Sequence, residues 1–372
     1  MIRNLAITVM FVLGFVYSQE WTYLKAGRSG LASNYVKSIQ IVKGVMYAAT
    51  DKGVSIISLT KDSIAQIDKT KMPKGVPSCM QAVGDTMWIG AGNTLVIYNM
   101  VSGTLVSIAS EESGIQNTIT SIAGSGDDVW IGTDGGGAFA FSRSGRHFTK
   151  FNRNSGLSSD NIRSVTALSD TILFGTSANG ISLYSRNDER HSRLDRYDGL
   201  TNNFVTAFVQ AFGKLYVGTY KGLSIFDPAK RDLRVAPGSR VMKEDLILSM
   251  AGDGRYLWLG GMGLVTRYDT KTDSVQSWSK AEGVPEDFIT GLAVYRDYLY
   301  AATDGNGIAI LNKKVPTVSL DRIDFKNRKG IVYGNFDSQS QPLTQSWSFF
   351  SPAARSVVFS KGVSPTGQSN GA

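Results

Sequence analysis

The sequence predicts an all-β fold, a seven-bladed β-propeller of four-stranded antiparallel blades. Three observations predict it. An aromatic residue recurs seven times at spacings of 41 to 44 residues, each copy has room for four short strands, and glycine is abundant. The 372 residues include 40 glycines but only 9 prolines. A glycine content of about 11%, above the usual 7%, beside many β-branched and aromatic residues favours short strands and tight turns.

The recurring aromatic residue opens a short motif in which Gly or Ala and then Thr usually follow. Its seven copies begin at Tyr47, Trp88, Trp130, Phe174, Tyr216, Trp258 and Tyr300. A period near 42 residues is typical both of propeller blades and of some helical repeats. Helical repeats need long stripes of apolar residues with a 3.6-residue period, and no copy contains one.

The fourth copy illustrates one blade. Its strand-sized runs are Ile162–Leu168, Thr171–Thr176, Gly180–Arg186 and Ser192–Tyr197, here named strands a to d. The a–b and b–c links are short and turn-like, as antiparallel hairpins require. Four antiparallel strands in 40 to 45 residues match one propeller blade.

The two ends of the repeat region complement each other. Trp21–Lys25 resembles a strand d, but no strands a to c precede it. The seventh copy has strands a, b and c and is followed by Lys313-Lys-Val-Pro316 instead of a strand d. We therefore expect Trp21–Lys25 to supply the outer strand of the last blade, which closes the ring and protects sheet edges.

The innermost strands carry a small residue nine or ten positions before each aromatic residue. These residues are Ser38, Cys79, Ser121, Ser164, Ala207, Ser249 and Gly291. Seven strands that converge on an axis leave little lateral space, so small residues are expected there. Cys79 is thereby predicted to be structural, and the strand-b aromatic residues are predicted to pack between blades, with ligand stacking as the alternative.

Three copies carry a family resemblance: Gly114–Ala138, Gly156–Tyr184 and Gly199–Asp227. Gly-Leu-x-x-Asn-x-Ile, then Val-Trp-Ile-Gly-Thr-x-x-Gly-Gly, and a strand that ends near Phe or Tyr together resemble the two-component regulator propeller repeat. That family occurs in extracytoplasmic sensor regions of bacterial hybrid histidine kinases and in stand-alone exported proteins. The resemblance covers residues 21–313 and implies a propeller with a sensory or binding role, but the sequence holds no kinase, receiver or DNA-binding segment.

The first residues have the layout of a secretory signal peptide. Arg3 precedes the apolar run Leu5–Val16, and small or modest residues surround Ser18. Twelve residues span about 18 Å as a helix, against a bilayer core of roughly 30 Å, although an N-terminal anchor is the alternative. We predict a signal peptide at 1–18, the propeller at 19–314, and a C-terminal extension at 315–372 that is disordered in part or a truncated β domain. The mature chain is then periplasmic, secreted or on the cell surface, with no transmembrane segment.

Residues that could carry chemistry are few. The single cysteine excludes an intramolecular disulfide, and His147 and His191 belong to no Cys/His cluster. The glycine run after Asp134 is not followed by a helix pattern and indicates a turn rather than a phosphate site. No catalytic residue, metal or cofactor is therefore predicted. The formal net charge of +8 suits acidic polymers or envelope surfaces but also serves plain solubility; nucleic acid is not an expected partner.

Propeller topology places the b–c turns and the d–a loops at one face. The b–c residues expected to ring the axis are Asp51, Asn93, Asp134, Asn179, Tyr220, Met262 and Asp304. A ring of Asp and Asn could bind a cation or sugar hydroxyls, although both residues are also ordinary turn formers. All of these except Met262 are the candidate binding residues.

The repeat stops near Val315, and Thr317–Asn327 and Gly330–Phe336 are two further β-like runs. A complete β-sandwich needs about 100 residues, more than remain. The sequence thus predicts a non-enzymatic scaffold that binds a ligand, a glycan or a protein at the propeller face, with envelope sensors or secretion machinery as possible partners. The alternative is a carbohydrate-active enzyme, a polysaccharide lyase or hydrolase, on the same scaffold.

Overall fold

The computed structural model describes residues 21–313, apart from 28, 62, 68–71 and 243–244, and three strands between 317 and 348. The predicted signal peptide lies outside the described residues. Residues 22–310 form one compact unit, and the three C-terminal strands belong to a second unit. The two are therefore considered separately.

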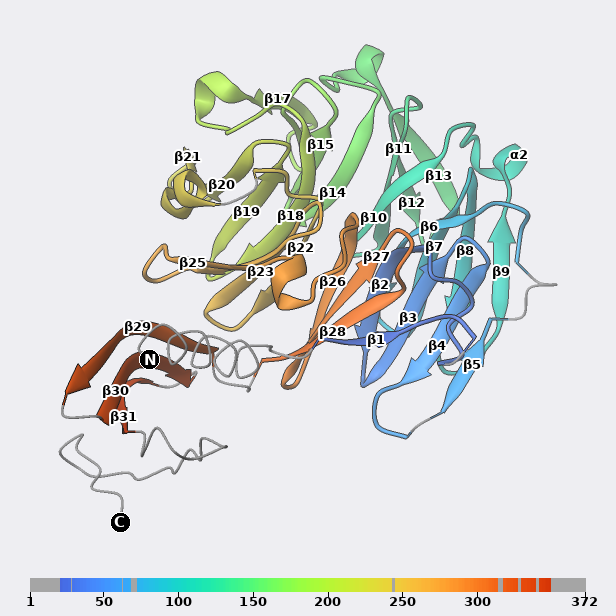
Figure 1. Cartoon of the computed structure of the whole chain (residues 1–372). Coiled ribbons are helices and arrows are strands. Elements are labelled where there is room, and N and C mark those ends of the chain that lie inside the picture. Colours follow the sequence, from blue (N-terminus) through green and yellow to red (C-terminus); the bar gives the residue numbers. More distant parts are fainter. Residues whose placement is uncertain are drawn as a thin grey trace. The chain divides into compact units, whose positions relative to one another are not determined.

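Seven four-stranded antiparallel sheets make up the first unit, as predicted. Each strand a contacts the strands a of both neighbouring blades, and those of the first and last blades also meet, so the sheets form a closed ring (Figure 1). Blades 1 to 3 are β2 (Val36–Val42), β3 (Val45–Thr50), β4 (Gly53–Ser58), β5 (Ile64–Gln66); β6 (Pro77–Val83), β7 (Thr86–Ala91), β8 (Thr94–Asn99), β9 (Leu105–Ile108); β10 (Ile119–Ser125), β11 (Asp128–Thr133), β12 (Ala138–Ser142), β13 (His147–Phe151). Blades 4 to 6 are β14 (Ile162–Leu168), β15 (Thr171–Thr176), β16 (Ile181–Ser185), β17 (Arg190–Leu194); β18 (Val205–Ala211), β19 (Lys214–Thr219), β20 (Gly222–Asp227), β21 (Asp232–Val235); β22 (Ser249–Asp253), β23 (Tyr256–Gly260), β24 (Val265–Asp269), β25 (Val275–Trp278).

The seventh blade joins the two ends of the ring. It consists of β26 (Ile289–Tyr295), β27 (Tyr298–Thr303), β28 (Ile308–Asn312) and, from the start of the chain, β1 (Thr22–Leu24). β1 runs antiparallel to β28, with Tyr23 opposite Ala309. The predicted closure by the N-terminal strand is confirmed.

Large side chains of strand b fill the space between blades. Trp88, for example, lies with Ile119, Val129 and Ile131 of the next blade in one buried cluster. Aromatic residues carry this position because each buries a large apolar area.

Strand b of the fourth blade is an exception to the aromatic pattern. The strands begin at equivalent points, so Leu173, not Phe174, occupies the position of Trp88 and Trp130. Leu173 packs toward blade 5, whereas Phe174 faces back to blade 3 and meets Trp130 with ring centroids 5.9 Å apart. Phe174 is therefore an inter-blade residue, as expected, but on the opposite face of its strand.

The small residues of strand a lie opposite small residues of strand b. Cys79 pairs with Gly90, and Ser121 pairs with Gly132. A Cβ atom at Gly132 would come within 2.6 Å of Ile162 in the next strand a. Close approach of consecutive blades near the axis thus accounts for the small side chains.

In the d–a loops that carry it, the Gly-Leu element has a structural role. Short helical turns, α2 (Ser110–Ser113), η1 (Arg153–Ser155), η2 (Arg196–Asp198) and η4 (Lys280–Glu282), precede it in four blades, and η3 (Pro237–Val241) lies in a fifth such loop. Gly156 ends η1 with a φ of 111°, a conformation that glycine adopts without strain. The following Leu157 is buried and anchors the loop in the core.

The C-terminal unit contains a three-stranded antiparallel sheet of β29 (Thr317–Lys326), β30 (Lys329–Ser338) and β31 (Gln341–Ser348). The first two strands match the two predicted β-like runs. The third was not predicted, since QPLTQSWS opens with Gln-Pro and shows no clear alternation of apolar and polar residues.

Candidate functional site

Backbone hydrogen bonds gather the b–c turns beside the starts of strands a. In six blades the N–H of the first turn residue donates to the carbonyl of the residue that precedes strand a of the same blade. These pairs are Asp51–Tyr35, Gly92–Val76, Asp134–Thr118, Ser177–Asn161, Tyr220–Phe204 and Asp304–Phe288. We call the surface formed by these twelve residues, with Met262, the axial face.

The predicted binding residues occupy this face in two registers. Asp51, Asp134, Tyr220 and Asp304 each hold the first turn position, and Met262 bridges to Phe288. In blades 2 and 4 that position belongs to Gly92 and Ser177, so Asn93 and Asn179 lie one and two residues farther along their turns. Ligand binding by this set stays a prediction.

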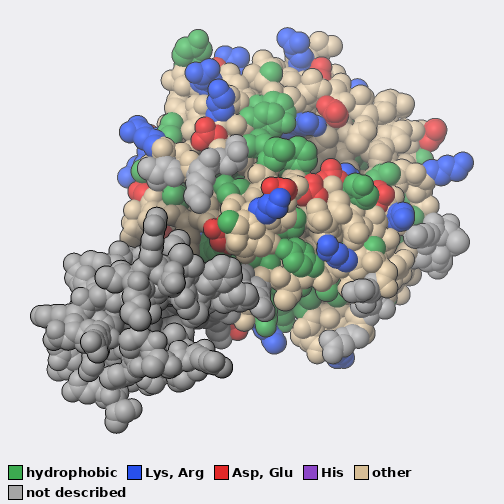
Figure 2. All heavy atoms as spheres, viewed as in Figure 1, with side chains coloured by type: hydrophobic (Ala, Val, Ile, Leu, Met, Phe, Trp, Pro, Cys, Tyr) green, Lys and Arg blue, Asp and Glu red, His purple; other side chains and the backbone are tan. Residues whose placement is uncertain are grey.

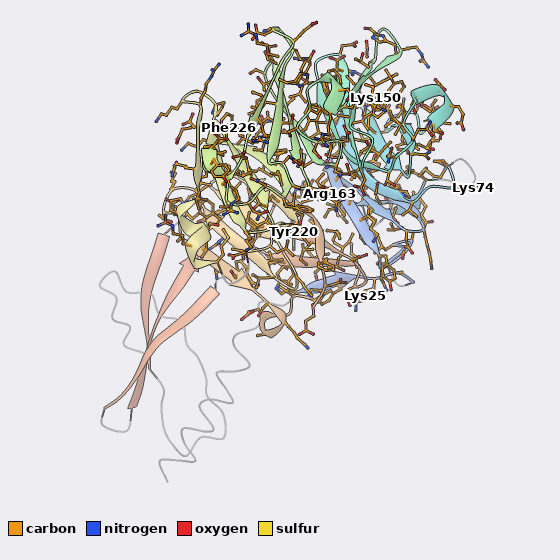
Figure 3. The ribbon with its side chains drawn as sticks, turned by 90° about the horizontal axis from the view of Figure 1, so that it is seen from above. Lys25, Lys74, Lys150, Arg163, Tyr220 and Phe226 are labelled. Atoms are coloured by element: carbon orange, nitrogen blue, oxygen red, sulfur yellow. The ribbon has the colours of Figure 1, made fainter. Side chains whose placement is uncertain are left out.

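A depression of about 390 Å³, the axial pocket, opens on this face. It draws its walls from five consecutive blades, and its residues are Ser78, Thr118, Ile119, Thr120, Asp134, Arg163, Phe204, Thr206, Tyr220 and Leu248. Asp134 and Tyr220 were predicted; Arg163 and Phe204 were not. Arg163 and Tyr220 lie toward the middle of the ring of blades (Figure 3).

Four residues form a mixed polar and aromatic cluster in this pocket. Phe204 and Tyr220 stack with ring centroids 3.8 Å apart and an interplanar angle of 13°. The guanidinium of Arg163 lies 5.5 Å from the centre of the Phe204 ring. Its nearest carboxylate, that of Asp134, is 3.9 Å away, too far for a hydrogen bond. Tyr220 is 42% exposed, so the stack faces solvent.

Hydroxyl groups link strands a around the axis at five of the seven junctions between blades. Each hydroxyl donates to a carbonyl at or just before the start of the next strand a, over 2.5 to 2.8 Å. The donor–acceptor pairs are Ser78–Ile119, Thr120–Ile162, Thr206–Ile247, Ser249–Ile289 and Thr290–Val36. We call these contacts the hydroxyl clasps.

Cations replace the hydroxyl at the two remaining junctions. Lys37 and Arg163 are the second residues of β2 and β14, the position held by Thr120 in β10. The ammonium of Lys37 lies 2.6 Å from Oδ1 of Asp304 in the preceding blade. Arg163 approaches Asp134 of its preceding blade in the same way but stops at the longer distance. The two sites thus differ in how well the cation is neutralised.

The Asn or Asp of the Gly-Leu-x-x-Asn motif has a structural role. Asp160 accepts a hydrogen bond from the N–H of Arg153 at 2.8 Å, and Asn203 accepts one from the N–H of Arg196 at 2.9 Å. Both side chains thus connect the d–a loop to the helical turn that precedes it.

The sequence does contain a signal for Arg163. The second residue of strand a is Ser78, Thr120 and Thr206 in blades 2, 3 and 5, and Arg163 interrupts this series of hydroxyl side chains in blade 4.

Outside the axial pocket, burial shifts the pKa values of Cys79 and His191. Burial raises the pKa of the Cys79 thiol to about 12, which leaves it protonated and unreactive. His147 is exposed, whereas burial lowers the pKa of His191, which packs against Tyr184. Among the described residues no group of three or more His, Cys, Asp or Glu side chains is placed to hold a metal ion. Lys and Arg side chains are spread over the visible face with acidic ones between them (Figure 2).

The part of the chain that the structure describes contains no helix long and apolar enough to span a membrane.

Comparison with known proteins gives structural likeness only. No family model and no curated protein matches the sequence. The extracellular domain of the putative hybrid two component system BT4673 from B. thetaiotaomicron matches with 17% identity and a TM-score of 0.65, over 94% of this chain and 48% of that one. The corresponding domain of BT3049 from the same organism matches with 17% identity and a TM-score of 0.67, over 88% and 49%. The WD40 repeats of RRP9 match with 11% identity and a TM-score of 0.61, over 80% and 98%. The chain spans about half the length of the two extracellular domains, and at these identities the likeness establishes the β-propeller fold.

Proposed function

We propose that this chain is a non-enzymatic binding scaffold that works outside the cytoplasm and holds its ligand or partner at the axial pocket. One observation carries the proposal: Arg163 takes a position that other blades use for hydroxyl clasps, and places its charge beside the exposed stack of Phe204 and Tyr220. At the equivalent position of blade 1, Lys37 is hydrogen-bonded to Asp304, whereas Arg163 approaches its carboxylate only to 3.9 Å. Convergent polar groups beside an apolar wall are the usual features of a binding pocket.

Location outside the cytoplasm and membership of the two-component regulator propeller repeat family belong to the same proposal. The predicted signal peptide and the three motif copies support both. The fold shared with extracellular domains from B. thetaiotaomicron is consistent with them. A sensory role, with an envelope sensor or secretion machinery as partner, extends the proposal by analogy alone.

The experiment is a binding screen of the full chain without residues 1–18 against glycan and peptide arrays, repeated with Arg163→Thr. Binding that is lost in the variant supports the axial pocket as the site. Binding that is unchanged in the variant would move the site elsewhere. Steady cleavage of a polysaccharide by the pure protein, abolished by Asp134→Asn or Asp304→Asn, would replace the scaffold by the carbohydrate-active enzyme.

A further inference from the structure

Lys37 and Arg163 are the two cations that replace hydroxyl clasps, and Arg163 is the less neutralised of them. Lys37 has a carboxylate at 2.6 Å, within hydrogen-bonding distance. Within the part of the chain that the structure describes, the Arg163 guanidinium makes no hydrogen bond, only a long ion pair of 3.9 Å with Asp134, and the side chain is 38% exposed. A guanidinium carries five N–H donors in one plane, an arrangement that matches the two oxygens of a carboxylate. The pocket therefore offers an open position for an anionic group.

An apolar platform adjoins this position. Phe204 contacts the guanidinium on one side of the pocket and stacks with Tyr220 beyond it. A ligand that places an anionic group on Arg163 therefore has a flat apolar surface next to that group. Recognition here favours an acid with an apolar or aromatic neighbour over a simple inorganic anion.

Exposed apolar side chains of the axial face indicate what kind of molecule carries that acid. Four large apolar side chains of the axial face are exposed by 42 to 60%: Tyr35, Tyr220, Met262 and Phe288. They belong to four consecutive blades, 5, 6, 7 and 1, and so follow one another around the axis. Aromatic residues, Met and Arg are the types enriched at the centres of protein–protein interfaces.

We propose, on the basis of the function given above, that the axial pocket binds an extended segment of a partner protein through a carboxylate on Arg163 and an adjoining apolar side chain on the Phe204–Tyr220 stack. The carboxylate belongs either to an Asp or Glu side chain or to the C-terminus of the segment. The arc from Tyr220 to Tyr35 then covers further apolar residues of the same segment.

Two substitutions at equivalent positions test this assignment. Arg163→Thr installs the side chain that Thr120 and Thr206 carry in their blades and should preserve the fold. Lys37→Thr makes the same change in blade 1, where the cation already has a partner. Loss of a charge-assisted hydrogen bond should weaken peptide binding at least about tenfold in Arg163→Thr. Lys37→Thr should stay within about twofold of the unchanged protein.

The probe is an array of peptides in which an acidic residue lies next to Phe, Tyr, Trp or Leu, with free and amidated C-termini. Matched peptides replace Asp by Asn and Glu by Gln. Binding by amidated acidic peptides assigns the side-chain carboxylate, and binding by free C-termini alone assigns the terminal one. Hits are then measured by calorimetry with both variants and with Tyr220→Ala, which should also weaken binding.

Four outcomes would overturn the inference. Equal binding of acidic and amide peptides would remove the carboxylate, and equal losses in Arg163→Thr and Lys37→Thr would remove the special position of Arg163. Binding of a glycan or phosphate panel that depends on Arg163, with no peptide bound, would leave the proposed scaffold intact and replace its partner class. Absence of any binding that depends on Arg163 would reject the inference and also the axial pocket as the site of the proposed function.

Discussion

Thr22 and Ile310 lie opposite each other in the antiparallel pair of β1 and β28, although 287 residues separate them in the chain. This pair ties the start of the propeller to its end, so the ring closes through hydrogen bonds between strands rather than through a covalent link. The stability of every blade boundary depends on that closure, because a ring that opens exposes two sheet edges.

A disulfide at this pair should stabilise the protein. Opposite residues in antiparallel strands have Cα atoms about 4.5 to 5.5 Å apart, within the range of disulfides. Closing so long a loop should add up to roughly 5 kcal/mol through the unfolded state. We expect the Thr22→Cys/Ile310→Cys protein to melt at a higher temperature when oxidised than when reduced. Equal melting of the two forms would show that the strand pair opens without consequence; the single Thr22→Cys protein controls for the reagents.

The repeat made the blade number, the strand order and the closing strand predictable, because a 42-residue period leaves few alternatives. The exact position of a residue within its strand was harder to predict in a blade that departs from the pattern. Phe174 follows Leu173, and an aromatic residue one position late looks like the repeat until strand lengths are compared. Asn93 and Asn179 lie one and two residues beyond the first turn position, which Gly92 and Ser177 hold in their blades.

The centre of the candidate site could not be predicted from one copy of the repeat. Phe204 is the last residue of a d–a loop and Arg163 is the second residue of a strand, so neither stands out within its own blade. They meet only because blade 5 follows blade 4 around the axis. Arg163 stands out only by comparison with the hydroxyl clasps at the other junctions, and those contacts join residues about 40 positions apart.

Gly132 should not tolerate a methyl group. A Cβ atom there would lie 2.6 Å from Cγ2 of Ile162 and 3.0 Å from Cγ2 of Val165, both in the next blade. We expect Gly132→Ala to lower the free energy of unfolding by about 1 to 3 kcal/mol. Gly252→Ala is the matched control, because its Cβ atom would meet nothing closer than 3.6 Å. Urea unfolding of both variants measures the difference, and equal stabilities would contradict the close approach of the blades.

Asp269 should make stability depend on pH. The guanidinium of Arg255 bonds the buried Asp269 carboxylate and holds its pKa well below the usual range, with help from the N–H groups of Lys271 and Thr272. A lowered pKa in the folded state stabilises the protein above the unfolded value of about 3.9, and this contribution is lost as pH falls below it. The protein should therefore exceed Asp269→Asn in stability at pH 7, and the gap should shrink at pH 3. A gap that is independent of pH in urea titrations would reject this role of the charge.

Removing a hydroxyl clasp and adding one should change the free energy of unfolding in opposite directions. Thr290→Val removes the hydrogen bond to the carbonyl of Val36 and should cost about 1 kcal/mol of unfolding free energy, since the shape of the side chain is kept. Arg163→Thr places a hydroxyl where blade 4 lacks one and should leave stability unchanged or raise it by a similar amount. If Arg163→Thr gains stability and loses ligand binding, then Arg163 contributes to binding and lowers the stability of the propeller. Thermal and urea unfolding of both variants decide the matter, because destabilisation by Arg163→Thr would make Arg163 a structural residue and remove the reason to place a ligand on it.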